Sequence, residues 1–168
     1  MDHLLLVRCQ LGEREALTEL VRAWHQPVWT YARRMLGPAR ADDVSQEIWL
    51  AVLRGLPRLR DTERFRPWLF TIARRSVVNA LRSSYGEPGP EPVEPVLDDP
   101  ADTLLDRVEL AAGLAKVPAR EREVLILFYL EDLSLEDCAE ICAVPVGTVK
   151  SRLNRARRLL RTHLTENP

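Results

Sequence analysis

Apolar positions near the C-terminus follow the period of two consecutive helices. In the first, apolar residues recur at i, i+3, i+4 and i+7, at Leu135, Cys138, Ala139 and Cys142. Ser134 precedes this stripe and Asp137 follows it by three residues, which is the pattern of a helix N-terminal cap. The stripe breaks at Ala143 and Val144, and Pro145 suits the first turn of a new helix because it lacks an amide proton. A second apolar arc then comprises Val146, Val149, Leu153, Ala156 and Leu160. The pattern predicts a helix-turn-helix.

The polar arc of the second predicted helix is basic. Between Val144 and Arg161 the chain has six basic residues and no acid. Residues near the start of a recognition helix reach base edges, where Arg and Lys suit guanine and Asn suits adenine. We therefore expect base contacts from Lys150, Ser151, Asn154 and Arg155. The later Arg157, Arg158 and Arg161 are expected to hold phosphates. The alternative is a solvated basic helix end, but a helix dipole accounts for only a charge or two in the last turn.

The N-terminal half also carries helical periodicity. One stripe keeps helical spacing for about five turns and consists of Leu17, Leu20, Val21, Trp24, Val28, Tyr31, Ala32 and Met35. We expect Pro27 to bend this helix and Gly37-Pro38 to end it. A second helix is predicted from near Asp42 to Gly55, and a third from Trp68 to Arg82 after a loop over 60–67. No segment alternates with period two, so the predicted fold is all-α.

A proline-rich acidic segment separates the two halves. Residues 83–103 contain five prolines, two glycines and six acids, a composition that neither buries a core nor carries a regular helix. The prediction is two small helical domains, 1–82 and 104–168, joined by a flexible acidic linker over 83–103.

The formal net charge of -1 hides an uneven distribution. Residues 1–82 carry 14 basic and 9 acidic side chains, and residues 104–143 carry 4 basic and 9 acidic ones. The basic residues of the C-terminal half therefore gather after residue 143. Although the net charge by itself would argue against nucleic acid, its distribution favours DNA as a partner.

Targeting and metal signals are weak. No apolar run reaches the 18 residues of a membrane span, and the first residues lack the order of a signal peptide, so we expect a cytoplasmic protein without membrane insertion. Three cysteines do not form a disulfide framework. Cys138 and Cys142 are one helical turn apart, but His3, His25 and His163 are not at zinc-finger spacing. We therefore interpret Cys138 and Cys142 as buried apolar thiols, and we expect no metal or cofactor. A redox role for Cys9, Cys138 or Cys142 and a zinc-containing partner remain open at this point.

Three motifs, spread over nearly the whole chain, resemble those of bacterial RNA polymerase sigma factors of the extracytoplasmic-function (ECF) group of the sigma-70 family. Asp42-Asp-Val-Ser-Gln-Glu-Ile-Trp49 and Trp68-Leu-Phe-Thr-Ile-Ala-Arg-Arg75 are similar to elements of sigma region 2. Pro118-Ala-Arg-Glu-Arg-Glu-Val-Leu125 and the segment from Val144 to Leu153 are similar to region 4. The resemblance implies a protein that directs core RNA polymerase to promoters.

The resemblance implies a polymerase-docking face on the second predicted helix. The matching positions, which would contact the β′ clamp helices, are Asp43, Gln46, Glu47, Trp49 and Leu53. An aromatic anchor with polar neighbours suits a groove on a partner. Trp49 could instead be a core residue. Contact with the β flap is implied for region 4.

The resemblance further implies that the 60–67 loop and the helix after it open and read the promoter -10 element. A flipped base needs an aromatic pocket with hydrogen-bonding groups and nearby cations. The candidates are Arg64, Phe65, Arg66, Trp68, Arg74, Arg75 and Asn79. Arg75 stands where the family often has Asn, and Asn79 where it often has Asp, which puts the preferred base in doubt. Core packing is the alternative for Phe65 and Trp68.

Region 4 is implied to read the -35 element through Lys150, Ser151, Arg152, Asn154 and Arg155. Ala143 replaces a glycine that is common in the turn, and a positive φ there would cost about 1 kcal/mol. The resemblance also implies that the acidic linker runs toward the active centre and RNA exit path of the polymerase, although a plain solvated spacer has the same composition. An anti-sigma factor is a further implied partner.

Two other functions compete with this interpretation. A repressor or activator acting without polymerase would explain residues 104–168 but would leave the Asp42–Trp49 motif and the aromatic loop without a role. Such a protein would bind duplex promoter DNA specifically by itself. An enzyme is disfavoured because the chain shows no paired carboxylates at metal-ligand spacing, no P-loop and no Cys/His nucleophile arrangement. We therefore expect a protein that is not an enzyme.

Overall fold

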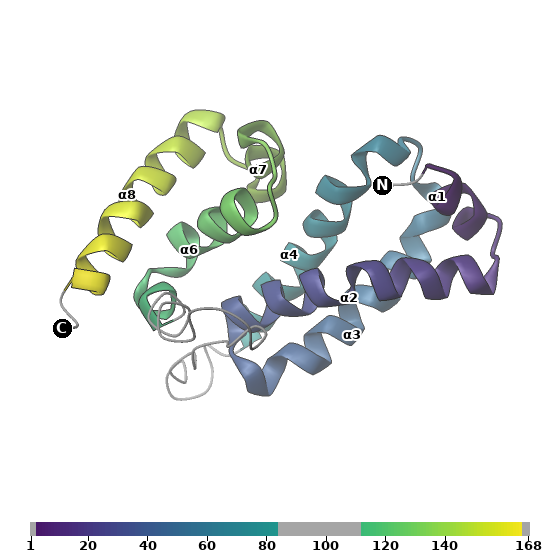
Figure 1. Ribbon diagram of the computed structural model, residues 1–168, viewed down its shortest axis with the longest axis horizontal. Coiled ribbons are helices and arrows are strands. Elements are labelled where there is room, and N and C mark those ends of the chain that lie inside the picture. The colour runs from purple at the N-terminus through teal and green to yellow at the C-terminus, as the bar shows by residue number, and fades with distance from the viewer. Residues whose placement is uncertain (1–2, 84–111, 166–168) are drawn as a thin grey trace.

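The computed structural model describes residues 3–83 and 112–165, and its regular elements are helices (Figure 1). The N-terminal half contains α1 (His3–Gln10), α2 (Arg14–Leu36), α3 (Pro38–Gly55), η1 (Leu56–Arg58), η2 (Thr62–Arg64) and α4 (Phe65–Ser83). The C-terminal half contains helical residues 112–116, α6 (Ala119–Leu125), the π-helical turn η4 (Ile126–Leu130), α7 (Leu135–Cys142) and α8 (Val146–Thr165). No strand occurs among the described residues, and the all-α prediction is confirmed. The predicted linker lies outside them, except for Ser83, which ends α4.

The helix boundaries differ from the predicted ones in two places. Gly37 ends α2 with φ of 86° and donates its amide to the Arg33 carbonyl at 2.8 Å, as expected of a glycine stop. However, α3 starts directly at Pro38 rather than near Asp42, because proline is compatible with the first turn of a helix. Similarly, α4 starts at Phe65 rather than Trp68, so the predicted 60–67 loop is shorter.

A short helix that the sequence did not predict supports the segment before that loop. Helix α1 packs against α2 and η1. The side chain of Gln10 donates to the carbonyls of Leu56 at 3.1 Å and Leu59 at 2.7 Å. The Asp61 carboxylate then caps η2 by accepting from the Glu63 amide at 3.0 Å. These bonds satisfy the backbone where the chain leaves α3 and turns toward α4.

The predicted helix-turn-helix is present as α7 and α8. The Ser134 hydroxyl accepts the Asp137 amide at 3.0 Å, which confirms the predicted cap. Ala143 adopts the left-handed conformation with φ of 53°, confirming that the turn needs a positive φ. Helix α8 begins directly after Pro145, whose carbonyl accepts from Thr148 and Val149. The apolar arc of α8 packs inward, with Val149, Leu153 and Ala156 almost fully buried.

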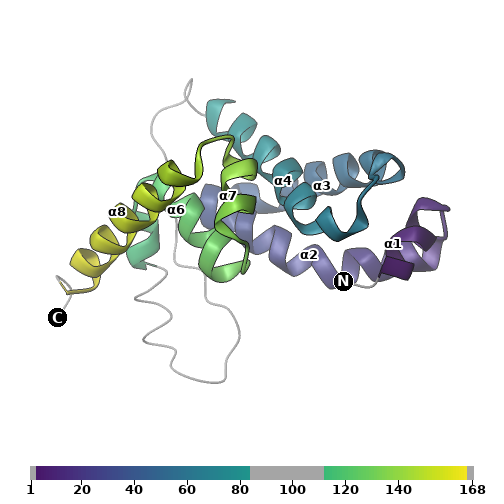
Figure 2. The ribbon, with the colours of Figure 1, turned by 90° about the horizontal axis from the view of Figure 1, so that it is seen from above.

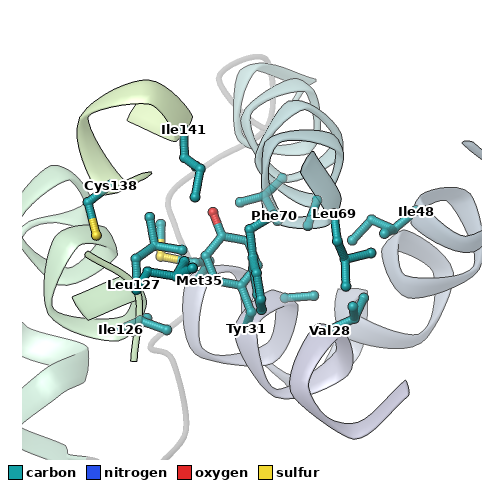
Figure 3. Packing of buried hydrophobic residues seen from close by; sticks show 14 of the residues in the cluster. Val28, Tyr31, Met35, Ile48, Leu69, Phe70, Ile126, Leu127, Cys138 and Ile141 are labelled. Carbon is teal, nitrogen blue, oxygen red and sulfur yellow. The ribbon is translucent and has the colours of Figure 1, made fainter. Parts of the chain in front are cut away.

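The two halves pack against each other instead of lying apart. Helices α6 and α7 lie between α8 and the N-terminal helices (Figure 2), with α7 against α4 and α6 against α2. Figure 3 shows Tyr31, Met35 and Phe70 of the N-terminal half facing residues of the other half, among them Leu127, Cys138 and Ile141. These residues belong to one continuous buried cluster. The sequence predicted the two halves but not this shared core.

Candidate nucleic-acid and protein interfaces

Helix α8 presents the predicted DNA-reading face to solvent. The exposed side chains are Lys150, Ser151, Asn154, Arg155, Arg157, Arg158 and Arg161, and Arg152 is half-buried. The apolar arc on the opposite side holds the helix against α6 and α7. Cationic and hydrogen-bonding groups along one side of a helix suit the major groove of DNA.

Two cations of this face have neighbours within the C-terminal half. Arg155 lies 3.5 Å from the mostly buried carboxylate of Glu121. The guanidinium of Arg157 lies over the ring of Tyr129, with 5.7 Å to the ring centroid. Both arginine side chains stay exposed, so these contacts orient them without removing them from solvent.

Helix α3 carries the predicted polymerase-docking face on its exposed side. Asp43, Gln46, Glu47 and Leu53 are exposed, as the prediction requires. Leu50 shares their side of the helix and is 58% exposed, although the sequence reasoning did not include it. Its position four residues after Gln46 and three before Leu53 could have identified it. The face thus combines polar groups with two exposed leucines.

Trp49, in contrast, is in the core. Its side chain is 7% exposed and belongs to the buried cluster with Ile48 and Val52. Its indole nitrogen is buried without a hydrogen-bond partner. In this conformation Trp49 supports α3 from inside and is not part of the exposed face.

The two aromatic candidates for the -10 pocket also point inward. Phe65 is fully buried, in edge contact with Trp24 at 5.6 Å between ring centroids and next to Trp68 at 5.9 Å. Trp68 is half-buried, and a Cβ atom added at Gly55 would come within 2.9 Å of its ring. Close approach of the indole therefore requires glycine at the end of α3. In this conformation the Phe65 ring is not free to stack on a base, and the Trp68 ring is partly covered.

The polar candidates of the same region fall into two groups. Arg75 and Asn79 are exposed on α4. Arg64, Arg66 and Arg74 instead contact the C-terminal half. Arg64 pairs with Asp137 at 2.7 Å and with Glu140, and Arg66 donates to the backbone carbonyl of Glu131. The sequence did not indicate these partners.

Glu123 is the partner of Arg74 and the centre of a buried polar cluster. Its carboxylate, on α6, accepts from the Tyr31 hydroxyl and from Arg74 Nε, both at 3.0 Å. The Cys142 thiol lies 3.6 Å from its other oxygen. Glu123 is only 4% exposed, and a buried carboxylate needs such donors. Burial and the adjacent carboxylate raise the pKa of the Tyr31 hydroxyl well above its usual value.

The buried thiols are protonated at neutral pH. Burial, with neighbouring carboxylates adding to it, raises the pKa of both Cys138 and Cys142 to about 12. A thiol without thiolate character is a poor nucleophile and a poor metal ligand. This agrees with the interpretation of these cysteines as apolar core residues.

Glu131 is the second buried acid between the halves. It is 7% exposed, and burial raises the pKa of its carboxyl from 4.5 to about 7, against the opposing effect of Arg66 and Arg34. Its position in the sequence, next to the exposed Asp132, gave no sign of burial.

The described residues contain neither a metal-binding cluster nor a membrane-spanning helix. Within residues 3–83 and 112–165, no group of three or more His, Cys, Asp or Glu side chains is arranged to hold a metal ion. No helix in these two ranges combines the length and apolarity of a membrane span.

Comparison with known protein families matches both halves of the chain. The model of sigma-70 region 2 matches residues 20–85, and the model of sigma-70 region 4 matches residues 107–160. The chain belongs to the sigma-70 family. Its relatives place it in the ECF group: the ECF RNA polymerase sigma factor SigC of Mycobacterium tuberculosis is 34% identical over 87% of this chain and 82% of its own length. SigW of Bacillus subtilis is 27% identical over 92% of each chain.

Two solved structures share the fold of this one. CnrH, in complex with the cytosolic domain of CnrY, is 25% identical with a TM-score of 0.74, covering 99% of both chains. RpoE of Bartonella quintana, in complex with the anti-sigma factor NepR, has a TM-score of 0.76 over 90% of this chain and 98% of that one, at 23% identity. In this sigma factor, region 2 thus corresponds to α2–α4, and region 4 includes α6–α8.

Proposed function

We propose that this ECF sigma factor docks on the β′ clamp helices of core RNA polymerase through the exposed side of α3. Asp43, Gln46 and Glu47 would fix the register, and Leu50 and Leu53 would supply apolar contact. Exposed leucines beside polar groups on one helix face are typical of helix-in-groove recognition. Trp49 would act from the core by holding the shape of this face. The β flap is the proposed second docking site, contacted by region 4.

Region 2 is proposed to read and open the -10 element. Arg64, Arg66, Arg74, Arg75 and Asn79 would contact the separated strand. The buried Phe65 and the half-buried Trp68 would support that surface. Cations near an aromatic cluster are the residue types that single-stranded DNA binding requires. Because Phe65 is fully buried here and Trp68 is half-buried, a base could stack on the Phe65 ring only after a local rearrangement.

Region 4 is proposed to read the -35 element. The exposed start of α8 would place Lys150, Ser151, Arg152, Asn154 and Arg155 in the major groove, with the later arginines on phosphates. The match of both family regions, in order along one chain, is the observation that carries the whole proposal. A repressor that acts without polymerase would need only the region 4 match.

An anti-sigma factor is a proposed partner, and the cytoplasm is the proposed location. The RpoE relative of known structure was solved with its anti-sigma factor, and CnrH was solved with the cytosolic domain of CnrY. Core polymerase and promoter DNA, the proposed partners, are both found in the bacterial cytoplasm.

Run-off transcription tests the proposal directly. Purified core polymerase would be assayed with and without the full chain on candidate promoters of the same genome. We expect transcripts only when core polymerase and the chain are both present. Gln46→Ala combined with Leu53→Ala should abolish these transcripts. Specific binding of duplex promoter DNA by the chain alone, with no transcript from any promoter, would favour the repressor interpretation. The matched control is Glu19→Ala combined with Leu11→Ala, which changes exposed residues away from α3.

A further inference from the structure

Three cations assigned to the -10 strand are held by region 4 in this conformation. Arg64 pairs with Asp137 at 2.7 Å and with Glu140, both on α7. Arg66 donates to the Glu131 carbonyl, and Arg74 lies 3.0 Å from the Glu123 carboxylate. These contacts lie along a single junction, where Arg64 at the end of η2 and Arg66 and Arg74 on α4 meet the α6–α7 side of region 4.

The acids at this junction account for a charge pattern that DNA reading leaves unexplained. Residues 104–143 carry 9 acidic and 4 basic side chains, although they precede the basic recognition helix. An excess of acids on a DNA-binding domain repels DNA unless it faces another surface. In this structure Asp137, Glu140 and Glu123 face arginines of region 2, as DNA phosphates would.

The junction has a buried part and an exposed part, which differ in strength. Glu123 is almost completely buried and takes two donors from region 2, so its geometry fixes how the halves dock. The Arg64 side chain is 44% exposed and its partner Glu140 is 63% exposed. Asp137, the other partner of Arg64, is 17% exposed. Exposed pairs are weak and screened by salt, so the Arg64–Glu140 pair can open first.

We propose that region 4 is an intramolecular competitor of the -10 strand: the docked form holds Arg64 and Arg74 on its own acids and Arg66 on a backbone carbonyl, and the halves must separate at the α4–α7 junction before the strand can bind. The inference rests on the proposed -10 role of these arginines. It adds that the free chain is closed to DNA by its own acidic residues. The shared apolar core of Tyr31, Phe70 and Ile141 sets the cost of opening.

Single-stranded DNA binding by the full chain, without polymerase, tests the competition. The probe is a fluorescent 20-nucleotide oligo(dT), followed by anisotropy at low salt. The test variant is Asp137→Asn combined with Glu140→Gln, which frees Arg64 without changing side-chain size. We expect it to bind about two- to tenfold more tightly than the unchanged chain, which corresponds to the loss of two ion pairs of Arg64. Adding Arg64→Ala to this variant should remove the gain.

A matched control separates competition from net charge. Asp132→Asn combined with Glu136→Gln removes two exposed acids of region 4 for which no contact with region 2 is found in the described structure. It changes the net charge by the same amount, so a general charge effect would raise binding equally in both variants. Equal gains would overturn the inference.

A second variant and a second measurement address the buried part. Glu123→Gln weakens the bond to Arg74, and small-angle X-ray scattering of the full chain should then show a larger radius of gyration. The Asp137 and Glu140 variant, which lacks the ion pairs of Arg64, should also show a larger radius of gyration than the unchanged chain at low salt. An unchanged radius in both variants would contradict the opening.

Run-off transcription separates this inference from the proposed function. If the unchanged chain supports transcription and the Asp137 and Glu140 variant gains no affinity for oligo(dT), the competition is wrong and the function stands. If the variant gains affinity but the unchanged chain never supports transcription, the proposed function fails while the junction is retained.

Discussion

The hydroxyl of Tyr31 donates a hydrogen bond of 3.0 Å to the carboxylate of Glu123, across 92 residues of sequence. Tyr31 is on α2 of region 2, and Glu123 is on α6 of region 4. Both side chains are buried, so this bond joins the two halves inside a shared core and not at the surface.

Tyr31→Phe tests the value of this bond for stability. The substitution keeps the ring and its edge contact with Phe70 but removes one donor from a buried carboxylate. Losing a bond to a buried charged group should lower the free energy of unfolding by about 1–3 kcal/mol, measured by urea denaturation. Tyr129→Phe is the control, because Tyr129 is 52% exposed. Removing its hydroxyl should change the free energy of unfolding by less than about 0.5 kcal/mol. If both substitutions lower the free energy of unfolding by the same amount, the bond between Tyr31 and Glu123 does not have the stabilising role assigned to it.

Two arginines of α8 should affect DNA binding differently. Arg155→Ala should relax sequence choice at one -35 position and cost about 1–3 kcal/mol on the preferred site. Arg161→Ala should weaken binding evenly across sequences and flatten its salt dependence, because a phosphate contact carries no sequence information. Competition binding of holoenzyme to a set of -35 variants measures both. Equal losses on every sequence from both variants would rule out base reading by Arg155.

Leu50→Ala should reduce transcription without unfolding the chain. The side chain is exposed, so little packing is lost, while an apolar contact with polymerase would disappear. We expect weaker binding to core polymerase, measured by anisotropy of the labelled chain, and an unchanged Tm. Trp49→Ala is the contrast, since removing a large buried ring should destabilise the fold by about 3–5 kcal/mol. Unchanged polymerase affinity for Leu50→Ala would remove this residue from the docking face.

Ala143→Gly should stabilise the protein. Ala143 has φ of 53°, a conformation that glycine adopts without the strain of a Cβ atom. The expected gain is about 1 kcal/mol in the free energy of unfolding. The same change at the exposed helical Ala23 should instead cost about 1 kcal/mol. A loss of stability at both positions would show that the turn does not strain Ala143.

Stability should fall as pH rises from about 4.5 to about 7, through the ionisation of Glu131. Its folded-state pKa is raised to about 7 from 4.5, chiefly by burial, so the folded state binds more protons than the unfolded state within this window. Glu131→Gln removes this dependence. Relative to the unchanged chain, the variant should gain about 2–4 kcal/mol between pH 4 and pH 8, measured by urea denaturation at each pH. A constant difference between the two proteins would contradict the raised pKa.

Local patterns predicted the helix-turn-helix well. Ser134, the break before Pro145 and the apolar arc of α8 each depend on residues within one or two helical turns, and the structure places all of them as expected. Helix starts were less accurate, as at Phe65, because aromatic packing against Trp24 extends α4 by residues that periodicity assigned to a loop.

The sequence by itself determined the all-α class, the helix-turn-helix and the exposed basic side of α8, because helix periodicity, capping and charge sidedness are local properties. Only the tertiary structure decided that Trp49 and Phe65 are buried, that Glu123 is a shared acceptor, and that Arg64, Arg66 and Arg74 meet region 4. Those outcomes depend on contacts between residues far apart in the chain. Periodicity places an aromatic residue on one side of a helix, but it does not show whether a distant part of the chain packs against that side.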